Sequence, residues 1–264
     1  MRLRFMLAAA ALVAGTLAVS AASAAPVYMR STVEQPWGVN TNEDAMDAVF
    51  GAGNWDDLRY ETADAASVFS GANHFVFMEG GDSNADELET FLTANIAAIE
   101  AWVAAGGRLL LNSAPNEGDG MSFGFGVTLN SNCCDDASNP ATATDGTHPI
   151  FAGPATPVAT DYTGSFFAHS IVTGAGLSSI LEGDAGTILA EMSVGSGLAL
   201  FGSMTTDNFH DPQPQAHNLR INIIAYTAGA TPPPPPDGDV PEPMTVALLG
   251  LGVLGLGALR RRAI

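Results

Sequence analysis

Short apolar runs alternate with an amphipathic segment in the first half of the chain. The runs VYMRST (residues 27–32), HFVFMEGGD (74–82) and RLLLNSA (108–114) are brief and are bounded by polar or glycine residues, which predicts strands. Between the last two runs, an apolar side chain recurs every three or four residues and predicts a helix over 84–105. Its apolar positions are Leu88, Phe91, Leu92, Ile96, Ile99 and Val103.

Weaker patterns complete this half of the chain. Residues 43–50 predict a short helix with Asn42 as its N-cap, and 56–62 and 64–71 predict a strand and a helical turn. Strands that alternate with helices in this way favour a parallel sheet with right-handed crossovers.

The second half is dominated by strand patterns. Residues 115–165 lack a clear period and are expected to be rich in loops. Four apolar runs follow and a final helix is predicted over 216–229, with VGSG (194–197) as a hairpin turn between the last two runs. These runs are 166–174, 178–184, 187–193 and 198–204. The predicted fold class is a three-layer α/β sandwich with a mainly parallel central sheet and a β-rich C-terminal half.

The N-terminus has the pattern of a secretory signal peptide. Arg2 and Arg4 precede an apolar run over 5–19, and the small residues Ala22-Ser23-Ala24 follow it as a cleavage site. We therefore interpret residues 1–24 as a signal peptide that directs the chain to the Sec export machinery.

The C-terminus carries a proline-rich linker and an apolar segment. Residues 230–239 contain five consecutive prolines, which favour an extended spacer, and leave 26–229 as one folded domain. The apolar run 244–259 would span about 24 Å as a helix, slightly less than a hydrocarbon core of about 30 Å. Arg260, Arg261 and Arg262 follow it and favour a cytoplasmic end for this transmembrane segment.

The ordered combination of Val-Pro-Glu-Pro, a short apolar span and a terminal arginine cluster in 240–264 resembles the PEP-CTERM sorting signal. This resemblance implies export in a Gram-negative bacterium and recognition by an exosortase, with cleavage near Pro241, Glu242 and Pro243. It further implies passage through the inner membrane and display at the cell surface or in the extracellular matrix. A role with exopolysaccharide or biofilm, and a polysaccharide partner, are implied in the same way.

The charge balance excludes several functions. Residues 26–229 contain four arginines and 25 acidic residues, and the whole chain has no lysine. Nucleic-acid backbones would be repelled, and both a Walker P-loop and Schiff-base chemistry require the missing lysine. We expect no cofactor and no nucleic-acid partner.

The two cysteines are adjacent, at Cys133 and Cys134. Export favours their oxidation, and a vicinal disulfide, an intermolecular bridge and free thiols all stay open. A bond between neighbouring residues closes almost no chain, so in the entropic picture it would add little to global stability.

A second resemblance covers most of 27–229. The segments FVFMEGGD, IEAWVAAGGRLLLNSA, TTDNFH and NLRINIIAYTA are similar to the class I glutamine amidotransferase-like fold, a flavodoxin-like sandwich. Active members of that family place a cysteine in a Gly-x-Cys-x-Gly turn after a central strand. This chain instead has Asn112-Ser113-Ala114-Pro115 there, so the resemblance implies that amidotransferase chemistry is absent.

Two alternative sites follow from the residues. Ser113 could act as a nucleophile with His210 as its base and the backbone N–H groups of Gly80 and Gly81 as oxyanion donors, which would make a secreted serine hydrolase. Against it, no Gly-x-Ser-x-Gly turn is present.

The second alternative is a calcium-dependent adhesive module. Asp82, Asn84 and Asp86 occupy alternate positions as in a calcium loop, but Glu87 stands where glycine is required and Thr93 where glutamate is required. Helix capping explains this stretch more simply. The histidines show no metal-ligand spacing, so we expect no metal site.

Trp37, Trp55 and Trp102 are expected in the core, with a sugar-stacking platform as the alternative. The main hypothesis is therefore an exported α/β domain that acts by binding or by structural presence, without turnover.

Overall fold

A computed structural model describes residues 25–82, 84–116, 120–131 and 140–230. The predicted signal peptide 1–24, most of the proline-rich linker and the C-terminal segment 240–264 lie outside these residues. So do Cys133 and Cys134, so the alternatives for their redox state stay open.

The N-terminal part of the chain builds the parallel half of a large sheet. Its strands are β1 (Val27–Arg30), β2 (Asp56–Arg59), β3 (Phe75–Asp82), β4 (Arg108–Pro115) and β12 (Gly197–Gly202). They lie in the order β2-β1-β3-β4-β12 and all neighbours are parallel. The strands predicted around residues 27, 56, 74 and 108 are thereby confirmed.

The other half of this sheet is antiparallel. Its strands are β11 (Gly186–Val194), β10 (Ser178–Gly183), β7 (Ala141–Ala143), β8 (Asp161–Gly164) and β13 (His210–Asp211). The hairpin predicted at residues 194–197 joins β11 to β12 and reverses the chain, and every later pairing is antiparallel. The expectation of a mainly parallel sheet was therefore wrong: four of nine pairings in the described part are parallel.

The region expected to be loop-rich contains short strands as well. β5 (Met121–Gly124) and β6 (Val127–Ser131) form a second sheet with β9 (Ser170–Gly174), and α4 (Pro149–Ala152) lies between β7 and β8. These strands are three to five residues long. β5 and β6 pair with each other as a hairpin, whereas β6, β7 and β9 also pair with segments far away in the sequence. Local periodicity does not detect such strands, because their stability comes from non-local pairing and burial.

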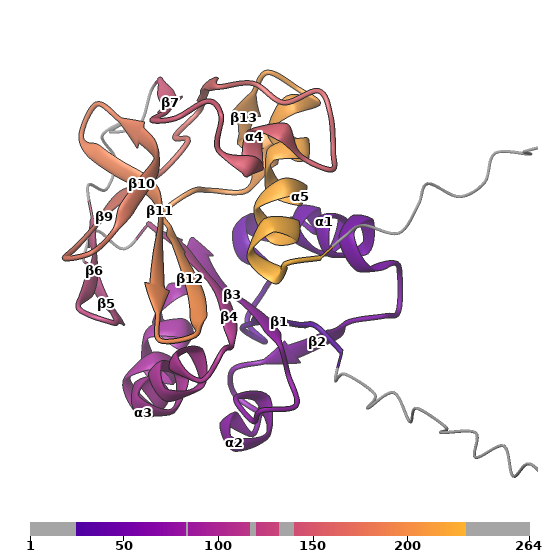
Figure 1. Ribbon diagram of the computed structural model, residues 1–264, viewed down its shortest axis with the longest axis vertical. Helices are drawn as coiled ribbons and strands as arrows, with labels where there is room; N and C mark the ends of the chain where they lie inside the picture. Colours follow the sequence, from indigo (N-terminus) through magenta and orange to yellow (C-terminus); the bar gives the residue numbers. More distant parts are fainter. Residues whose placement is uncertain (1–24, 83, 117–119, 132–139, 231–264) are drawn as a thin grey trace, which may run out of the picture.

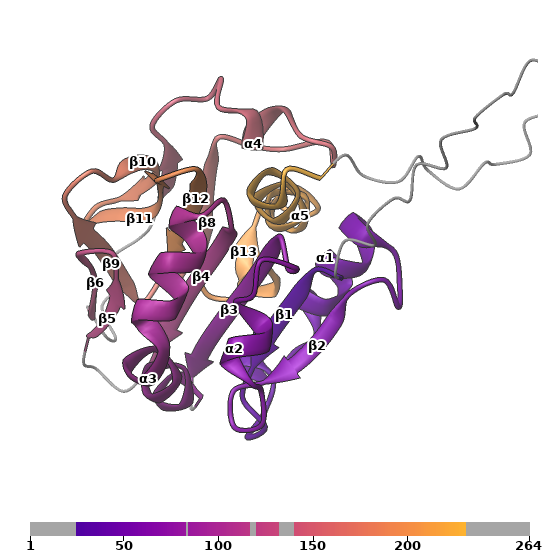
Figure 2. The same cartoon turned by 60° about the horizontal axis from the view of Figure 1, so that its bottom comes forward.

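Helices cover both faces of the large sheet (Figures 1 and 2). α1 (Thr41–Phe50) and α5 (Gln215–Ala228) lie on one face, and α2 (Ala65–Val68) and α3 (Ala85–Ala104) lie on the other. The long helices predicted at 84–105 and 216–229 are confirmed within a residue or two. α1 starts earlier than predicted, with Asn40 as its N-cap, and Asn42 instead donates from Nδ2 to the hydroxyl of Tyr28 at 3.3 Å.

Strand alternation assigns each side chain near the ends of β3 and β4 to a face of the sheet. In β3, Phe75 and Phe77 join the core under α1 and α5, so Glu79 also lies on that face. A Cβ at Gly80 would instead contact Leu88 of α3. In β4, Leu109 and Leu111 pack in the core under α3 and Leu110 packs under α5. Asn112 therefore lies on the α5 face and Ser113 on the α3 face.

Among the described residues, no helix has both the length and the apolar character needed to cross a membrane. The predicted transmembrane segment 244–259 is not among them.

Candidate functional site

A pocket lined mainly by aromatic rings lies near the carboxyl ends of β4 and β12. It has a volume of about 220 Å³ and is called the aromatic pocket below. Its lining residues are Trp37, Asn116, Ser165, Phe166, His169, Thr205 and Phe209. Open α/β sheets bind their ligands outside the carboxyl ends of their strands, so the position of this pocket is that of a ligand site.

Three separate segments supply the rings of the aromatic pocket. Trp37 comes from the 3₁₀ helix η1 (Pro36–Gly38), Phe166 and His169 from the turn between β8 and β9, and Phe209 from η2 (Asp207–Phe209). The His169 ring lies 4.9 Å from that of Trp37 and 5.3 Å from that of Phe166, with interplanar angles of 38° and 34°. The Phe209 ring meets Trp37 edge-on at 5.6 Å. The rings therefore form a continuous row.

Backbone strain is concentrated around the aromatic pocket. Trp37 and Phe166 both have φ near +57°, and Asp82, which accepts a hydrogen bond from Asn116 Nδ2 at 3.4 Å, has φ of +49°. Residues other than glycine rarely adopt this left-handed conformation, and such strain tends to cluster at functional sites. Phe125, on the β5–β6 turn, is the other described non-glycine residue with positive φ.

The close approach of Trp37 to β3 depends on Gly81. A Cβ at residue 81 would lie 2.6 Å from Trp37 Nε1, so a larger residue would push the indole away from the strand. The backbone N–H of Gly81 donates to Asn84 Oδ1 at 2.6 Å. Gly81 thus makes room for a wall of the pocket, which is a different role from the oxyanion donor considered from the sequence.

A buried polar cluster lies beneath α5, on the face of the sheet that carries Glu79 and Asn112. Glu79 and Arg220 are 1% and 2% exposed, and Arg220 Nη1 lies 3.4 Å from Glu79 Oε2. Arg220 Nη2 donates to the carbonyl of Thr205 at 2.7 Å. The amide of Asn112 donates to and accepts from the backbone of Met204. These bonds hold the segment after β12, which includes pocket residue Thr205.

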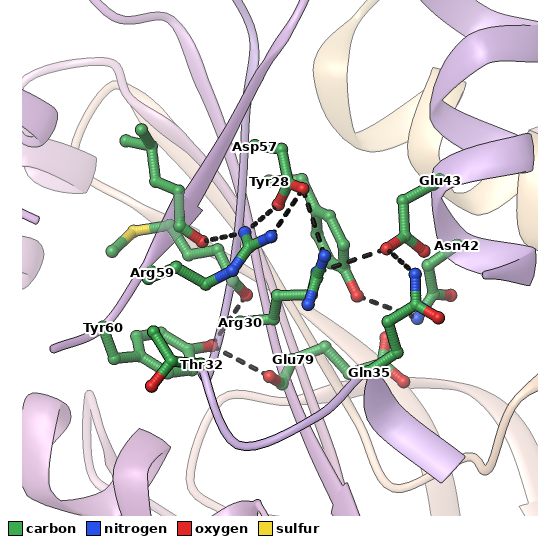
Figure 3. Close-up of polar contacts among 12 residues, drawn as sticks. Tyr28, Arg30, Thr32, Gln35, Asn42, Glu43, Asp57, Arg59, Tyr60 and Glu79 are labelled. Atoms are coloured by element: carbon green, nitrogen blue, oxygen red, sulfur yellow. Dashed lines mark hydrogen bonds and ion pairs between the residues drawn. The ribbon is translucent and has the colours of Figure 1, made fainter. Parts of the chain in front are cut away.

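Two tyrosines lie near Glu79 on opposite faces of the sheet. Tyr28 belongs to the core under α5, and Tyr60 belongs to the core under α3 and reaches the backbone of Glu79 through its hydroxyl (Figure 3). The hydroxyl of Tyr60 lies 2.9 Å from the carbonyl of Met29 and 3.0 Å from that of Glu79. Burial and then the charge of Glu79 raise the pKa of Tyr28 well above its ordinary value. Towards the sheet edge, Arg30 bridges Glu43 and Asp57, both at 3.2 Å.

His210 is a neutral, buried side chain. Its Nε2 lies 2.9 Å from Thr205 Oγ1, and its ring stacks on that of Phe167 at 3.9 Å. Burial, and then the charge of Arg220, lower the pKa of His210 to about 3. His217 is more exposed and pairs with Asp207 through Nδ1 at 2.8 Å, which raises the pKa of His217.

The structure does not bring Ser113 and His210 together. Ser113 is fully buried on the α3 face, where it pairs in register with Gly80, whereas His210 packs against Phe167 in the core on the α5 face. The sheet therefore separates the proposed nucleophile from its proposed base. The backbone N–H of Gly81 is already bonded to Asn84, so the hydrolase geometry inferred from the sequence was wrong.

The calcium candidates do not share a coordination position either. Asn84 Oδ1 accepts from Gly81 and its Nδ2 donates to the Glu34 carbonyl at 3.3 Å, so its side chain fastens the start of α3 to neighbouring backbone. Asp86 is exposed in the first turn of α3. Within the described ranges, no group of three or more His, Cys, Asp or Glu is arranged to hold a metal ion.

Glu79 makes stability depend on pH. Burial raises the pKa of Glu79 to about 7, from an ordinary 4.5, although Arg220 opposes the shift. Between these values the folded protein keeps a proton that the unfolded chain loses, so stability falls as pH rises and levels off above pH 7. In urea unfolding, we expect the wild type to lose about 3 kcal/mol relative to Glu79→Gln between pH 4.5 and 7.5.

Glu61→Gln is the control for this pH series. Partial burial favours a higher pKa, but hydrogen bonds from Ser31 and Thr32 outweigh it and lower the pKa of Glu61. The wild type should therefore gain stability relative to Glu61→Gln as pH rises, the opposite sign. If the free energies of unfolding of the wild type and of Glu79→Gln changed in parallel with pH, Glu79 would not be buried as described.

Sequence patterns missed most of the aromatic pocket. Phe166 and His169 were read within a strand, but β9 starts only at Ser170 and both precede it in a turn. Trp37 was expected in the core and is only half-buried. The one local signal was Pro36-Trp37-Gly38, where an aromatic residue sits between two turn-forming residues.

Residues 239–262 match the family model described as the PEP-CTERM protein-sorting motif. This match confirms the sorting signal identified at the C-terminus and supports an exported protein that an exosortase processes. It does not extend to the folded domain. No curated protein is significantly similar to the chain.

Solved structures resemble the folded domain only distantly. A β-galactosidase from Bacillus circulans sp. alkalophilus is 15% identical with a TM-score of 0.49, covering 83% of this chain and 34% of that one. An exo-β-1,4-mannosidase from Opitutaceae bacterium strain TAV5 is 15% identical with a TM-score of 0.44, covering 79% and 36%. Agd3, a carbohydrate deacetylase, is 9% identical with a TM-score of 0.42, covering 78% and 32%. The chain spans about a third of these proteins, and the likeness assigns neither a family nor an activity.

Proposed function

We propose that this protein is exported, sorted by an exosortase and displayed outside the cell, where its α/β domain acts as a non-catalytic binding module of the envelope or biofilm matrix. The observation that carries this proposal is the sorting motif at residues 239–262. The signal-peptide pattern at 1–24 supports the same route, because a C-terminal sorting tail acts only on a chain that has entered the export pathway.

The domain itself supports binding without turnover. The parallel strands lie in the order β2-β1-β3-β4-β12, which is the flavodoxin-like order and supports the amidotransferase-like fold that the sequence resembles. At the nucleophile position of that family, β4 continues through Asn112 and the buried Ser113 without a strand-to-helix turn. Such a site exposes no nucleophile, whereas the aromatic pocket beside it is open to a ligand.

Sorting is tested in a Gram-negative host that encodes an exosortase. The wild-type protein is expected outside the inner membrane in a form shortened by roughly the length of the tail. A variant with Pro241→Ala and Pro243→Ala should keep its full tail and stay in the inner-membrane fraction, because the cleavage site is altered while the apolar segment is intact. Fractionation followed by immunoblotting and mass spectrometry measures both properties.

Deletion of 240–264 provides the complementary measurement. Without the apolar segment the protein should leave the membrane fraction and accumulate as a soluble exported form. A variant with Arg260, Arg261 and Arg262 all changed to Lys keeps the positive charge and serves as a control for orientation. Identical partitioning of the wild type, the deletion and the Pro241/Pro243 variant would refute sorting by the tail.

A further inference from the structure

We propose that the aromatic pocket binds one neutral pyranose unit of a polysaccharide, with the C–H face of the sugar ring against the row formed by Trp37, His169 and Phe166. This inference rests on the proposed role as a binding module and names its ligand class. It follows from the rings, polar groups, charge and size of the pocket, taken in turn.

The rings provide the stacking surface. The C–H face of a pyranose is apolar and flat, and it gains contact and loses water when it lies on an aromatic row. The ring centroids of Trp37, His169 and Phe166 are separated by 4.9 and 5.3 Å with interplanar angles of 38° and 34°, so the three rings lean on one another and Phe166 forms one end of the row. Phe166 is 40% exposed although it is a large apolar residue, so part of its ring is available to a ligand.

The edge of the pocket supplies polar groups for the hydroxyls of a sugar. The side chains of Ser165 and Asn116 line the pocket beside the rings, whereas the hydroxyl of Thr205 is already bonded to the Phe166 carbonyl and to His210 Nε2. A hydroxyl and an amide can each donate and accept, which matches the mixed donor and acceptor pattern of sugar hydroxyls.

Charge selects a neutral ligand over an anionic one. No lysine or arginine lines the pocket, and Asp82 lies at its edge beside Asn116. The whole chain has a formal net charge of −19 at pH 7. A uronic acid or a sulfated sugar would therefore meet repulsion without an opposing cation.

The size of the pocket selects one sugar unit. Its volume of about 220 Å³ is below the roughly 300–1,000 Å³ typical of sites for drug-sized ligands. A single ring can occupy it while the rest of a polymer continues into solvent. Contacts with Gly81, His169 and Phe209 hold the Trp37 ring in place before binding, so little ordering entropy is lost there.

The test is calorimetric titration of the processed protein with neutral methyl glycosides and trisaccharides of glucose, galactose, mannose and N-acetylglucosamine. Glucuronic acid and N-acetylphenylalanine amide are titrated as the anionic and the apolar competitor. At least one neutral glycoside is expected to bind with saturation and to change the fluorescence of Trp37. Phe166→Ala should weaken this binding at least about tenfold, and Phe166→Tyr should retain it.

Phe125→Ala is the matched control. Phe125 is a second phenylalanine with positive φ, but it packs against Phe201 on the opposite face of the sheet and does not line the pocket. Its loss should leave glycoside binding unchanged. Equal binding by the wild type and Phe166→Ala would reject this site while leaving the binding module intact. Binding of the amide alone, or of none of the compounds, would reject a sugar ligand, and neither result alters the fractionation experiment that tests sorting.

Discussion

Replacing Arg220 with leucine is expected to destabilise the domain by about 3–5 kcal/mol at pH 8, because it leaves a buried carboxylate without its partner. Glu79 is 1% exposed, and Arg220 lies 3.4 Å from it. The substitution also removes the donor for the Thr205 carbonyl. At pH 5 the loss should be smaller, because the pKa of Glu79 is raised to about 7 and the protonated side chain needs no cation. Urea unfolding at both values measures the difference.

Arg108→Leu is the matched control for Arg220→Leu. Arg108 also connects a strand to α5, but it donates to the carbonyls of Tyr226 and Thr227 and forms no ion pair with a carboxylate within the described part of the chain. Its loss should cost about 1–2 kcal/mol and should not depend on pH in this range. The double variant Glu79→Met/Arg220→Leu should recover most of the stability that Arg220→Leu loses, because no buried charge is left. A double variant as unstable as Arg220→Leu would mean that the ion pair is not the cause.

Phe167→Ala is the second substitution with a large expected effect, a loss of about 3–5 kcal/mol. Phe167 is fully buried and packs on Tyr162 at 5.8 Å and on His210 at 3.9 Å. The resulting cavity should also expose His210 to water, so its pKa should rise from about 3 towards 6.5. Thermal unfolding measures the first effect, and NMR titration of the imidazole measures the second.

Phe166→Ala tests whether burial is responsible for the effect of Phe167→Ala. Phe166 is the neighbouring residue, has the same side chain and is 40% exposed, so its removal should change stability by only about 0.5 kcal/mol. Equal destabilisation by the two substitutions would contradict the assignment of Phe167 to the core and of Phe166 to the aromatic pocket.

The fold was predictable where a short stretch of sequence is enough to specify a helix, a strand or a turn. The apolar stripe of α3, the buried runs of β3 and β4 and the turn at residues 194–197 each lie within one short window, and the structure confirms them. The strands between residues 121 and 164 were missed because each is short and, apart from the β5–β6 hairpin, their pairings join distant segments. The antiparallel orientation of the strands beyond β12 was also missed, because one hairpin determines it and hydrophobic periodicity does not indicate strand orientation.

The candidate site was predictable only in its general place. Sequence patterns located the carboxyl ends of β3 and β4, and the aromatic pocket lies near that end of the sheet. They did not show that Ser113 faces α3 while Asn112 faces α5, because the face of each side chain depends on which core its neighbours enter. The hydrolase hypothesis failed at this step.

By itself, the sequence determined the route of this protein: the tail matched at residues 239–262 is a linear signal, read by export machinery from contiguous residues. It also determined that lysine-dependent chemistry is absent, since composition needs no geometry. Only the tertiary structure decided what lies at the candidate site. The rings of Trp37, Phe166 and Phe209 come from segments far apart in the chain, and the sheet separates Ser113 from His210. Such contacts arise from strand register and packing between distant segments, which no local pattern specifies.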